Sequence, residues 1–160
     1  MKTLSIYRKF ILLLFSLFFC YGVEWTASFF TQSSVGTWYQ SLQKPFWNPP
    51  NLAFPVIWTI LYTMIGVSFW KILCEPKAYC FQLFLAFFLQ IFLNFTWSFS
   101  FFYLQSPGMG LLNIILLLMA IIWNIKLFWA YSETAAKLLI PYLLWVAYAT
   151  SLNFTIWYLN

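Results

Sequence analysis

The sequence predicts an all-α integral membrane protein, a bundle of five transmembrane helices whose proline- and tryptophan-rich first loop folds over a pocket. Hydrophobic residues make up 64% of the 160 residues and charged residues 7%, whereas soluble domains carry roughly 25% charged residues. Because so few charges cannot cover a water-exposed surface, the composition argues against a soluble helical bundle. The apolar residues gather in five runs, each long enough to cross about 30 Å of hydrocarbon.

The first apolar run follows Lys2, Arg8 and Lys9, and we expect its helix over residues 9–30. A charged start followed by an apolar run also describes a signal peptide. This run is longer than the about 7–15 apolar residues of such a peptide, and no small-x-small cleavage site follows it. We therefore favour a retained transmembrane helix over a signal peptide.

Residues 31–52 form the expected first loop, which contains the stretch WYQSLQKPFWNPP. Prolines fix φ and remove backbone donors, so this stretch cannot be a membrane helix. An ordinary solvated loop would nevertheless expose four aromatic side chains to water: Trp38, Tyr39, Phe46 and Trp47. We therefore expect a stiff lid that folds back over an apolar surface.

Four further spans complete a single domain that covers residues 1–160. The break Ser106-Pro107-Gly108 separates the third span from the fourth, and Glu133 precedes the fifth. We expect these spans over residues 53–73, 78–104, 107–130 and 135–157.

The basic residues predict the orientation, because Lys and Arg concentrate on the cytoplasmic side of membrane proteins. With five spans, Lys44 alone falls on the side of the first loop. The remaining basic residues fall on the opposite side: Lys2, Arg8, Lys9, Lys71, Lys77, Lys126 and Lys137. We therefore expect the N-terminus inside, and the first loop and the C-terminus outside.

The residue inventory argues against most catalytic and metal chemistry. The chain has no histidine, which excludes a Ser-His-Asp triad and a histidine-ligated metal. It also has no glycine-rich phosphate loop and no run of basic residues that would indicate nucleic-acid binding. Cys20, Cys74 and Cys80 fit no C-x-x-C pattern, and a Cys74–Cys80 disulfide is an alternative that we do not favour. We expect no metal, no resident cofactor, no nucleic-acid partner and no conventional enzyme activity.

Glu24 is the one acidic residue inside an expected span. A carboxylate at membrane depth is a candidate functional residue. Glu24 lies near the outer end of the first span, however, so it could instead reach the interface or pair with Lys44. We favour one of these structural roles over a functional one.

Polar and aromatic side chains recur at helical spacing inside the later spans, on one face of each. In lipid, such polar groups must find partners inside the bundle. For Asn113 and Asn124 we favour interhelical hydrogen bonds, whereas for Gln90 and Asn94 a ligand pocket and interhelical bonding remain equally open. The stripes are Trp58, Tyr62 and Gly66; Gln90, Asn94 and Ser98 beside Trp97; Asn113, Ala120 and Asn124; and Trp145, Ala149, Asn153 and Trp157.

Four segments resemble the TspO/MBR family: WYQSLQKPFWNPP, VIWTILYTMIG, QIFLNFTWSFSFF and IPYLLWVAYATSLNFTIWYLN. These are the tryptophan-rich sensory proteins of bacteria, related to the mitochondrial translocator protein. The resemblance runs from about Gly22 to Asn160 in the family's order. It implies five transmembrane helices, frequently a homodimer, and a pocket under the first loop that binds porphyrins, cholesterol-like lipids and benzodiazepine-type ligands.

The resemblance places Trp38 and Trp47 in the loop that closes the pocket, and matches further residues to its lining. Those lining residues are Trp58, Asn94, Trp145 and Ala149. The stripes add Tyr62, Gln90 and Trp97 to the predicted ligand site. The mammalian members of the family end in a cholesterol-recognition motif, an aromatic residue followed by a basic one, but here Tyr158 precedes Leu159 and Asn160. We therefore expect weak sterol binding.

The predicted function is the binding of porphyrins or other tetrapyrroles, in the role of a sensor, regulator or transporter. The flat macrocycle would pack against aromatic rings, with its propionates directed to Lys44 or the membrane interface. One alternative is light-dependent porphyrin degradation, because Trp38 and Trp145 match tryptophans implicated in that reaction in the family. Another is a structural or partner-regulating membrane protein.

Overall fold

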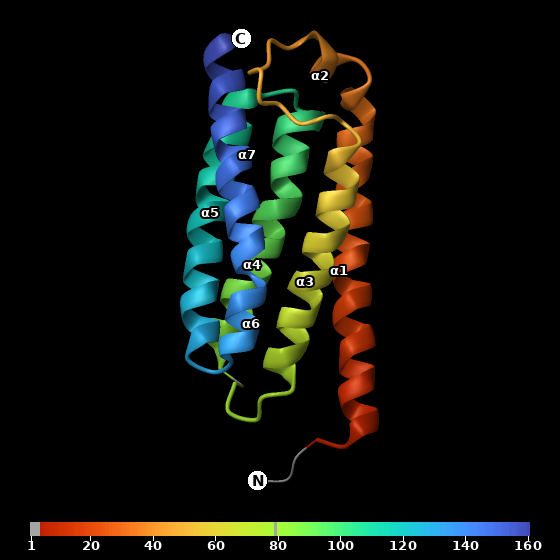
Figure 1. Ribbon diagram of the computed structural model, residues 1–160, viewed down its shortest axis with the longest axis vertical. Helices are drawn as coiled ribbons and strands as arrows, with labels where there is room; N and C mark the ends of the chain where they lie inside the picture. Colours follow the sequence, from red (N-terminus) through yellow and green to blue (C-terminus); the bar gives the residue numbers. More distant parts are fainter. Residues whose placement is uncertain (1–3, 79) are drawn as a thin grey trace.

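The computed structural model describes residues 4–78 and 80–160, which are helical apart from short connections and contain no strand. Figure 1 shows the long helices side by side in one bundle. The N-terminal end of the first helix and the C-terminal end of the last lie at opposite ends of that bundle. In chain order the elements are α1 (Ile6–Val35), α2 (Trp38–Ser41), α3 (Ala53–Leu73), α4 (Phe81–Ser98), the π-helix η1 (Phe99–Tyr103), α5 (Pro107–Trp129), α6 (Glu133–Leu138) and α7 (Ile140–Leu159).

Within the described residues, five segments are long and apolar enough to span a membrane: α1, α3, α4 with η1, α5, and α6 with α7. Their outward faces carry large apolar side chains, among them Phe18, Leu112 and Leu144, which are 83%, 64% and 65% exposed. A soluble protein would not expose such a surface, whereas lipid is its natural solvent. The predicted five-helix membrane bundle is therefore confirmed.

The first span is longer than the predicted 9–30, because α1 begins at Ile6 and ends at Val35. Ser5 caps its start, with the Ser5 hydroxyl accepting a hydrogen bond from the Arg8 amide at 3.4 Å. Near its end, Ser34 is buried and donates to the Phe102 carbonyl at 2.8 Å, which holds the last turn against η1. The predicted loop 31–52 is correspondingly shorter and contains the one-turn helix α2.

The second span matches the predicted 53–73, and the fourth differs by one residue at its end. The third begins at Phe81 rather than at residue 78, after a turn that contains Pro76; residue 79 lies outside the described part. It also ends in a π-helix, where the Leu104 amide bonds to the Phe99 carbonyl at 2.9 Å. This wider turn was not predicted, and π-turns often occur at functional sites.

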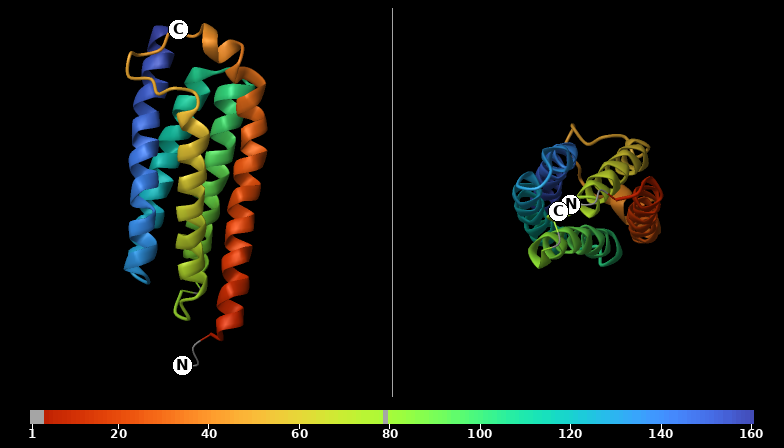
Figure 2. Two further views of the ribbon diagram at one scale, coloured as in Figure 1. Left: turned by 45° about the vertical axis from the view of Figure 1, so that its right-hand side comes forward. Right: turned by 90° about the horizontal axis from the view of Figure 1, so that it is seen from below.

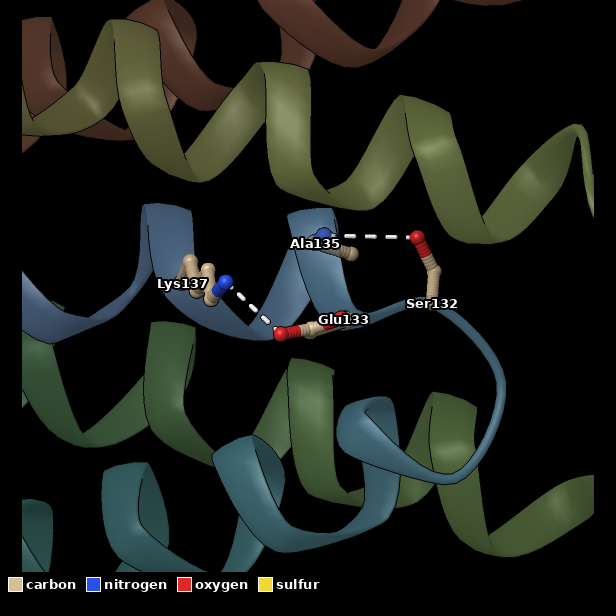
Figure 3. Close-up of polar contacts among 4 residues, drawn as sticks. All are labelled: Ser132, Glu133, Ala135 and Lys137. Carbon is tan, nitrogen blue, oxygen red and sulfur yellow. Dashed lines mark hydrogen bonds and ion pairs between the residues drawn. The ribbon is translucent and has the colours of Figure 1, made fainter.

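The fifth span, predicted over 135–157, is two helices that meet at Leu139. Pro141 lacks the amide hydrogen that would continue the helical hydrogen bonds, so one continuous helix cannot form through this point. Helix α6 starts early because the Ser132 hydroxyl accepts from the Ala135 amide at 3.3 Å. Figure 3 shows this cap and the exposed ion pair between Glu133 and Lys137, 2.7 Å long.

Helices α1 and α3 pack closely because Gly66 presents no side chain. The Ser16 hydroxyl donates to the Gly66 carbonyl at 2.9 Å. A Cβ atom at Gly66 would lie 2.9 Å from the Leu17 side chain. Small residues at such crossings let membrane helices approach and hydrogen-bond.

The connector, residues 36–52, crosses the end of the bundle where α7 also ends (Figures 1 and 2). Asn160 holds its middle, accepting from the Gln43 amide at 3.0 Å and donating to the Gln43 carbonyl at 3.1 Å. The Tyr148 hydroxyl donates to the Trp47 carbonyl at 2.6 Å. The C-terminal helix therefore positions the connector.

The aromatic side chains of the connector differ in their exposure. Tyr39 is buried, and its ring packs against Phe102 with centroids 5.6 Å apart. Phe46 is 95% exposed and Trp47 is 42% exposed. Both lie in the turn after Pro45, beyond the end of the packed helices, where aromatic side chains suit the membrane interface.

Candidate ligand-binding cavity

A cavity of about 230 Å³ lies between α1, α3 and α4, with Tyr39 of α2 and Asn51 of the connector at one end. Its volume is slightly below the roughly 300–1,000 Å³ typical of small-molecule sites. The lining consists of Glu24, Ala27, Ser28, Thr31, Gln32, Val35, Tyr39, Asn51, Phe54, Pro55, Trp58, Tyr62, Asn94, Trp97, Ser98 and Phe102.

Helix α1 supplies one wall of the cavity, which the sequence analysis did not include in the site. Its lining residues follow i, i+3, i+4, i+7, i+8 and i+11 spacing, so they form a single stripe. The stripe is mostly polar and begins with Glu24, whose carboxylate accepts a hydrogen bond from the Thr59 hydroxyl of α3 at 3.0 Å. The spacing was visible in the sequence and could have revealed this wall.

Helices α3 and α4 supply an aromatic wall. The Trp58 ring lies 5.9 Å from Tyr62 and 6.4 Å from Trp97, measured between centroids. Trp97 in turn stacks on Phe101 of η1, with centroids 5.7 Å apart and planes inclined by 24°. This connected set of rings gives a flat ligand a large apolar surface with little side-chain freedom to lose.

Asn94 both lines the cavity and joins three helices. Its side-chain oxygen accepts from the Tyr62 hydroxyl at 2.9 Å, and its amide nitrogen donates to the Tyr142 hydroxyl at 2.7 Å. All three residues are buried. Tyr142 of α7 was not among the predicted site residues, although it lies seven residues before Ala149 and therefore shares its face of α7.

A second buried link connects the cavity to α7 and α5. The Trp97 indole donates to the Asn153 side-chain oxygen at 3.2 Å, and the Asn153 amide donates to the Pro107 carbonyl at 2.8 Å. The cavity's polar and aromatic residues are therefore held in place from behind by the rest of the bundle.

Of the predicted site residues, Trp58, Tyr62, Asn94 and Trp97 line this cavity. The other five lie elsewhere. Trp145 does not line the cavity but packs against the lining residue Phe54, with ring centroids 6.0 Å apart. Trp38 packs on Phe101 at 5.6 Å, and Trp47 is at the exposed turn. Ala149 and Gln90 are buried in α7 and α4, outside the lining.

The remaining polar residues of the stripes have mixed surroundings. The Asn113 amide donates to the Thr96 hydroxyl of α4 at 2.8 Å, which is the interhelical bond expected of it. Gln90 and Asn124 are fully buried, and their side-chain amides have no hydrogen-bond partner among the described residues. The interhelical bond expected of Asn124 is therefore wrong. Glu24 does not pair with Lys44, because the Lys44 ammonium donates to the Gln40 and Leu42 carbonyls at 3.2 and 3.1 Å.

Outside the spans, Tyr39 is one of the two connector residues that line the cavity. Its hydroxyl donates to the Asn48 side chain at 2.9 Å. Burial raises the pKa of the Tyr39 phenol above its usual range, and the hydrogen bond from Tyr39 to Asn48 offsets part of that rise. Tyr39 is therefore a neutral donor at physiological pH.

The described residues contain no group of three acidic, cysteine or histidine side chains that could hold a metal ion. Cys20, Cys74 and Cys80 are free thiols.

Comparison with known proteins places this architecture in a family. The profile of the TspO/MBR family matches residues 16–159, which include most of α1 and the four later spans. The chain belongs to the TspO/MBR family. The tryptophan-rich protein TspO of Chlorobaculum tepidum is 42% identical over 143 residues, covering 88% of this chain and 90% of that protein.

Other members match a similar region. The tryptophan-rich protein TspO of Archaeoglobus fulgidus is 42% identical over 147 residues, which cover 87% of this chain and 90% of that protein. The human translocator protein is 33% identical over 126 residues, covering 75% of this chain and 73% of that protein. With its five apolar helices, this family member is a multi-pass integral membrane protein.

Proposed function

We propose that this family member binds tetrapyrroles and related flat apolar ligands in the cavity between α1, α3 and α4, as a sensor, regulator or transporter. The observation that carries the proposal is the aromatic wall, where Trp58, Tyr62 and Trp97 face a space that also holds the polar Asn94. An apolar cavity with a few converging polar groups is the usual form of a small-molecule site.

The size of the cavity limits how a tetrapyrrole enters. A whole macrocycle is larger than about 230 Å³, so one edge enters while the rest remains at the connector, or the connector moves outward. Tyr39 and Asn51 are the connector residues that line the cavity. In either arrangement the propionates stay toward the membrane interface, on the side of Lys44.

Tryptophan fluorescence of the detergent-purified protein, titrated with protoporphyrin, tests this proposal. Two variants each remove one tryptophan: Trp58→Leu alters the cavity, whereas Trp129→Leu alters an exposed position on α5. We expect saturable quenching in the wild type, weakened about tenfold or more in Trp58→Leu because an aromatic contact of about 1–3 kcal/mol per ring is lost. Trp129→Leu should bind like the wild type. Equal affinity in all three proteins would indicate partition into detergent and would refute the proposal.

Light-dependent porphyrin degradation has less support, because neither Trp38 nor Trp145 lines the cavity. Loss of porphyrin absorbance on illumination, absent in the dark and in a Trp145→Phe variant, would favour that activity over simple binding.

A further inference from the structure

The cavity carries one charged residue, and it is an acid. Among the described residues that line it, Glu24 is the sole carboxylate, and no lysine or arginine is present. The nearest basic residue of the connector, Lys44, is held by two backbone carbonyls and lies 4.8 Å from the Tyr39 ring centroid. The charge inside the cavity is therefore not neutralised by a basic side chain of the lining.

Glu24 retains an oxygen for a ligand. Its Oε1 atom accepts from Thr59, whereas its Oε2 atom has no hydrogen-bond partner in the described part of the chain. Thr59 lies outside the lining and uses its proton in this bond, so Glu24 presents acceptor oxygen to the cavity.

Two hydroxyls of the α1 wall have the same character, whereas the Gln32 amide on that wall carries both donors and an acceptor. The Ser28 hydroxyl donates to the Trp25 carbonyl at 2.7 Å, and the Thr31 hydroxyl donates to the Ala27 carbonyl at 3.5 Å. Their protons are directed back into the helix, which leaves oxygen lone pairs for the cavity. One wall is thus rich in acceptors and the opposite wall is aromatic.

We infer that the cavity prefers ligands that join a flat apolar body to a protonated nitrogen, and that Glu24 is the residue that determines this specificity. The flat body packs against Trp58 and Trp97, while the nitrogen donates to Glu24 in a charge-assisted hydrogen bond, about twice as strong as a neutral one. Aromatic faces also attract a cation. An anionic group is disfavoured here, since it would be desolvated beside a carboxylate. This inference rests on the proposed function, because it concerns the same cavity.

The test uses three pyrenes that share one flat body and differ in one group: pyrenemethylamine, pyrenemethanol and pyrenecarboxylate. Each is titrated against the protein in a neutral maltoside detergent, and binding is measured by quenching of tryptophan emission. We expect the wild type to bind the amine about tenfold more tightly than the alcohol, and the carboxylate most weakly.

Two charge-matched variants identify the responsible group. Glu24→Gln should reduce the ratio of amine to alcohol affinity from about ten to about one, because the amide cannot form the charge-assisted bond. Glu75→Gln removes the same charge from the turn between α3 and α4, outside the cavity lining, and should keep the wild-type ratio. Circular dichroism checks that both variants are folded.

The outcomes separate this inference from the proposed function. One outcome is that the pyrenes bind saturably and Trp58→Leu weakens all three, but the amine and the alcohol bind equally to the wild type. The preference for a cation is then refuted, and the proposed ligand site is retained. A ratio that stays at about ten in Glu24→Gln refutes the role of Glu24 in the same way. If no pyrene binds saturably, or if Trp58→Leu has no effect, both the inference and the proposed function are overturned. The order of the three affinities is measured on the wild type, so the preference for a cation is tested even if the Glu24→Gln protein misfolds.

Discussion

Replacing Asn94 by leucine should destabilise the bundle through the two tyrosines that it connects. The substitution keeps a similar side-chain volume but removes the hydrogen bonds from Tyr62 at 2.9 Å and to Tyr142 at 2.7 Å. Both tyrosines are buried, with 2% and 0% exposure. Tyr142 also lies outside the cavity lining, so water cannot replace its lost partner.

Two estimates bracket the loss of unfolding free energy in Asn94→Leu. Interhelical hydrogen bonds in membrane proteins contribute about 0.6 kcal/mol each, which gives about 1.2 kcal/mol for two. Leaving a buried polar group without a partner costs about 1–3 kcal/mol, and here two hydroxyls lose theirs. We therefore expect Asn94→Leu to lower the free energy of unfolding by about 3 kcal/mol, between these limits.

Unfolding by sodium dodecyl sulfate in mixed micelles, followed by circular dichroism, measures this change. Asn113→Leu is the matched control, because Asn113 makes one part-buried bond to Thr96 and should lose only about 0.6 kcal/mol. A triple variant that also carries Tyr62→Phe and Tyr142→Phe removes the unpaired hydroxyls and should recover much of the stability. The reasoning is refuted if Asn94→Leu loses no more than Asn113→Leu, or if the triple variant is as unstable as the single one.

Three further predictions concern helix packing, the connector and orientation. Gly66→Val should lower the unfolding free energy by about 1–3 kcal/mol, because its Cβ would lie 2.9 Å from Leu17; unchanged stability in the same SDS assay would contradict the close packing of α1 and α3. Tyr148→Phe removes the bond to the Trp47 carbonyl, so limited proteolysis should cut the connector several-fold faster, whereas equal rates would mean that this contact does not hold it. If the charge bias sets the orientation, the C-terminus lies outside, and a reporter enzyme that works only outside the cytoplasm should be active when fused there. A stable but inactive fusion would show the opposite orientation.

The number and position of the spans follow from local properties of the chain. Twenty or so apolar residues without a charge can be satisfied in lipid only as a helix, and this rule holds whatever the neighbours are. The second span begins at Ala53 and the fourth at Pro107, in agreement with the approximate bounds expected, because prolines lie at or near both positions. The inward faces of α3 and α4, with Trp58 and Asn94, were also predicted from helical periodicity alone.

Finer features depended on contacts between distant segments. The extension of α1 to Val35 is held by the bond between Ser34 and the Phe102 carbonyl, residues far apart in the chain. The π-turn at Phe99–Tyr103 has no marker in its composition. The exposure of Phe46 depends on how far the connector projects beyond the helices, which its own residues do not specify.

The residues of the cavity show most clearly which features follow from local sequence and which depend on tertiary contacts. Periodicity tells which residues share a face of one helix, but it does not tell which helices are neighbours. The contact between Ser16 and Gly66 brings α1 against α3, and this places Glu24 beside Thr59 and opposite the aromatic wall. A carboxylate for which the local sequence favoured a place at the interface or a pair with Lys44 thus lines the cavity. Helix adjacency results from packing of the whole bundle rather than from any single segment.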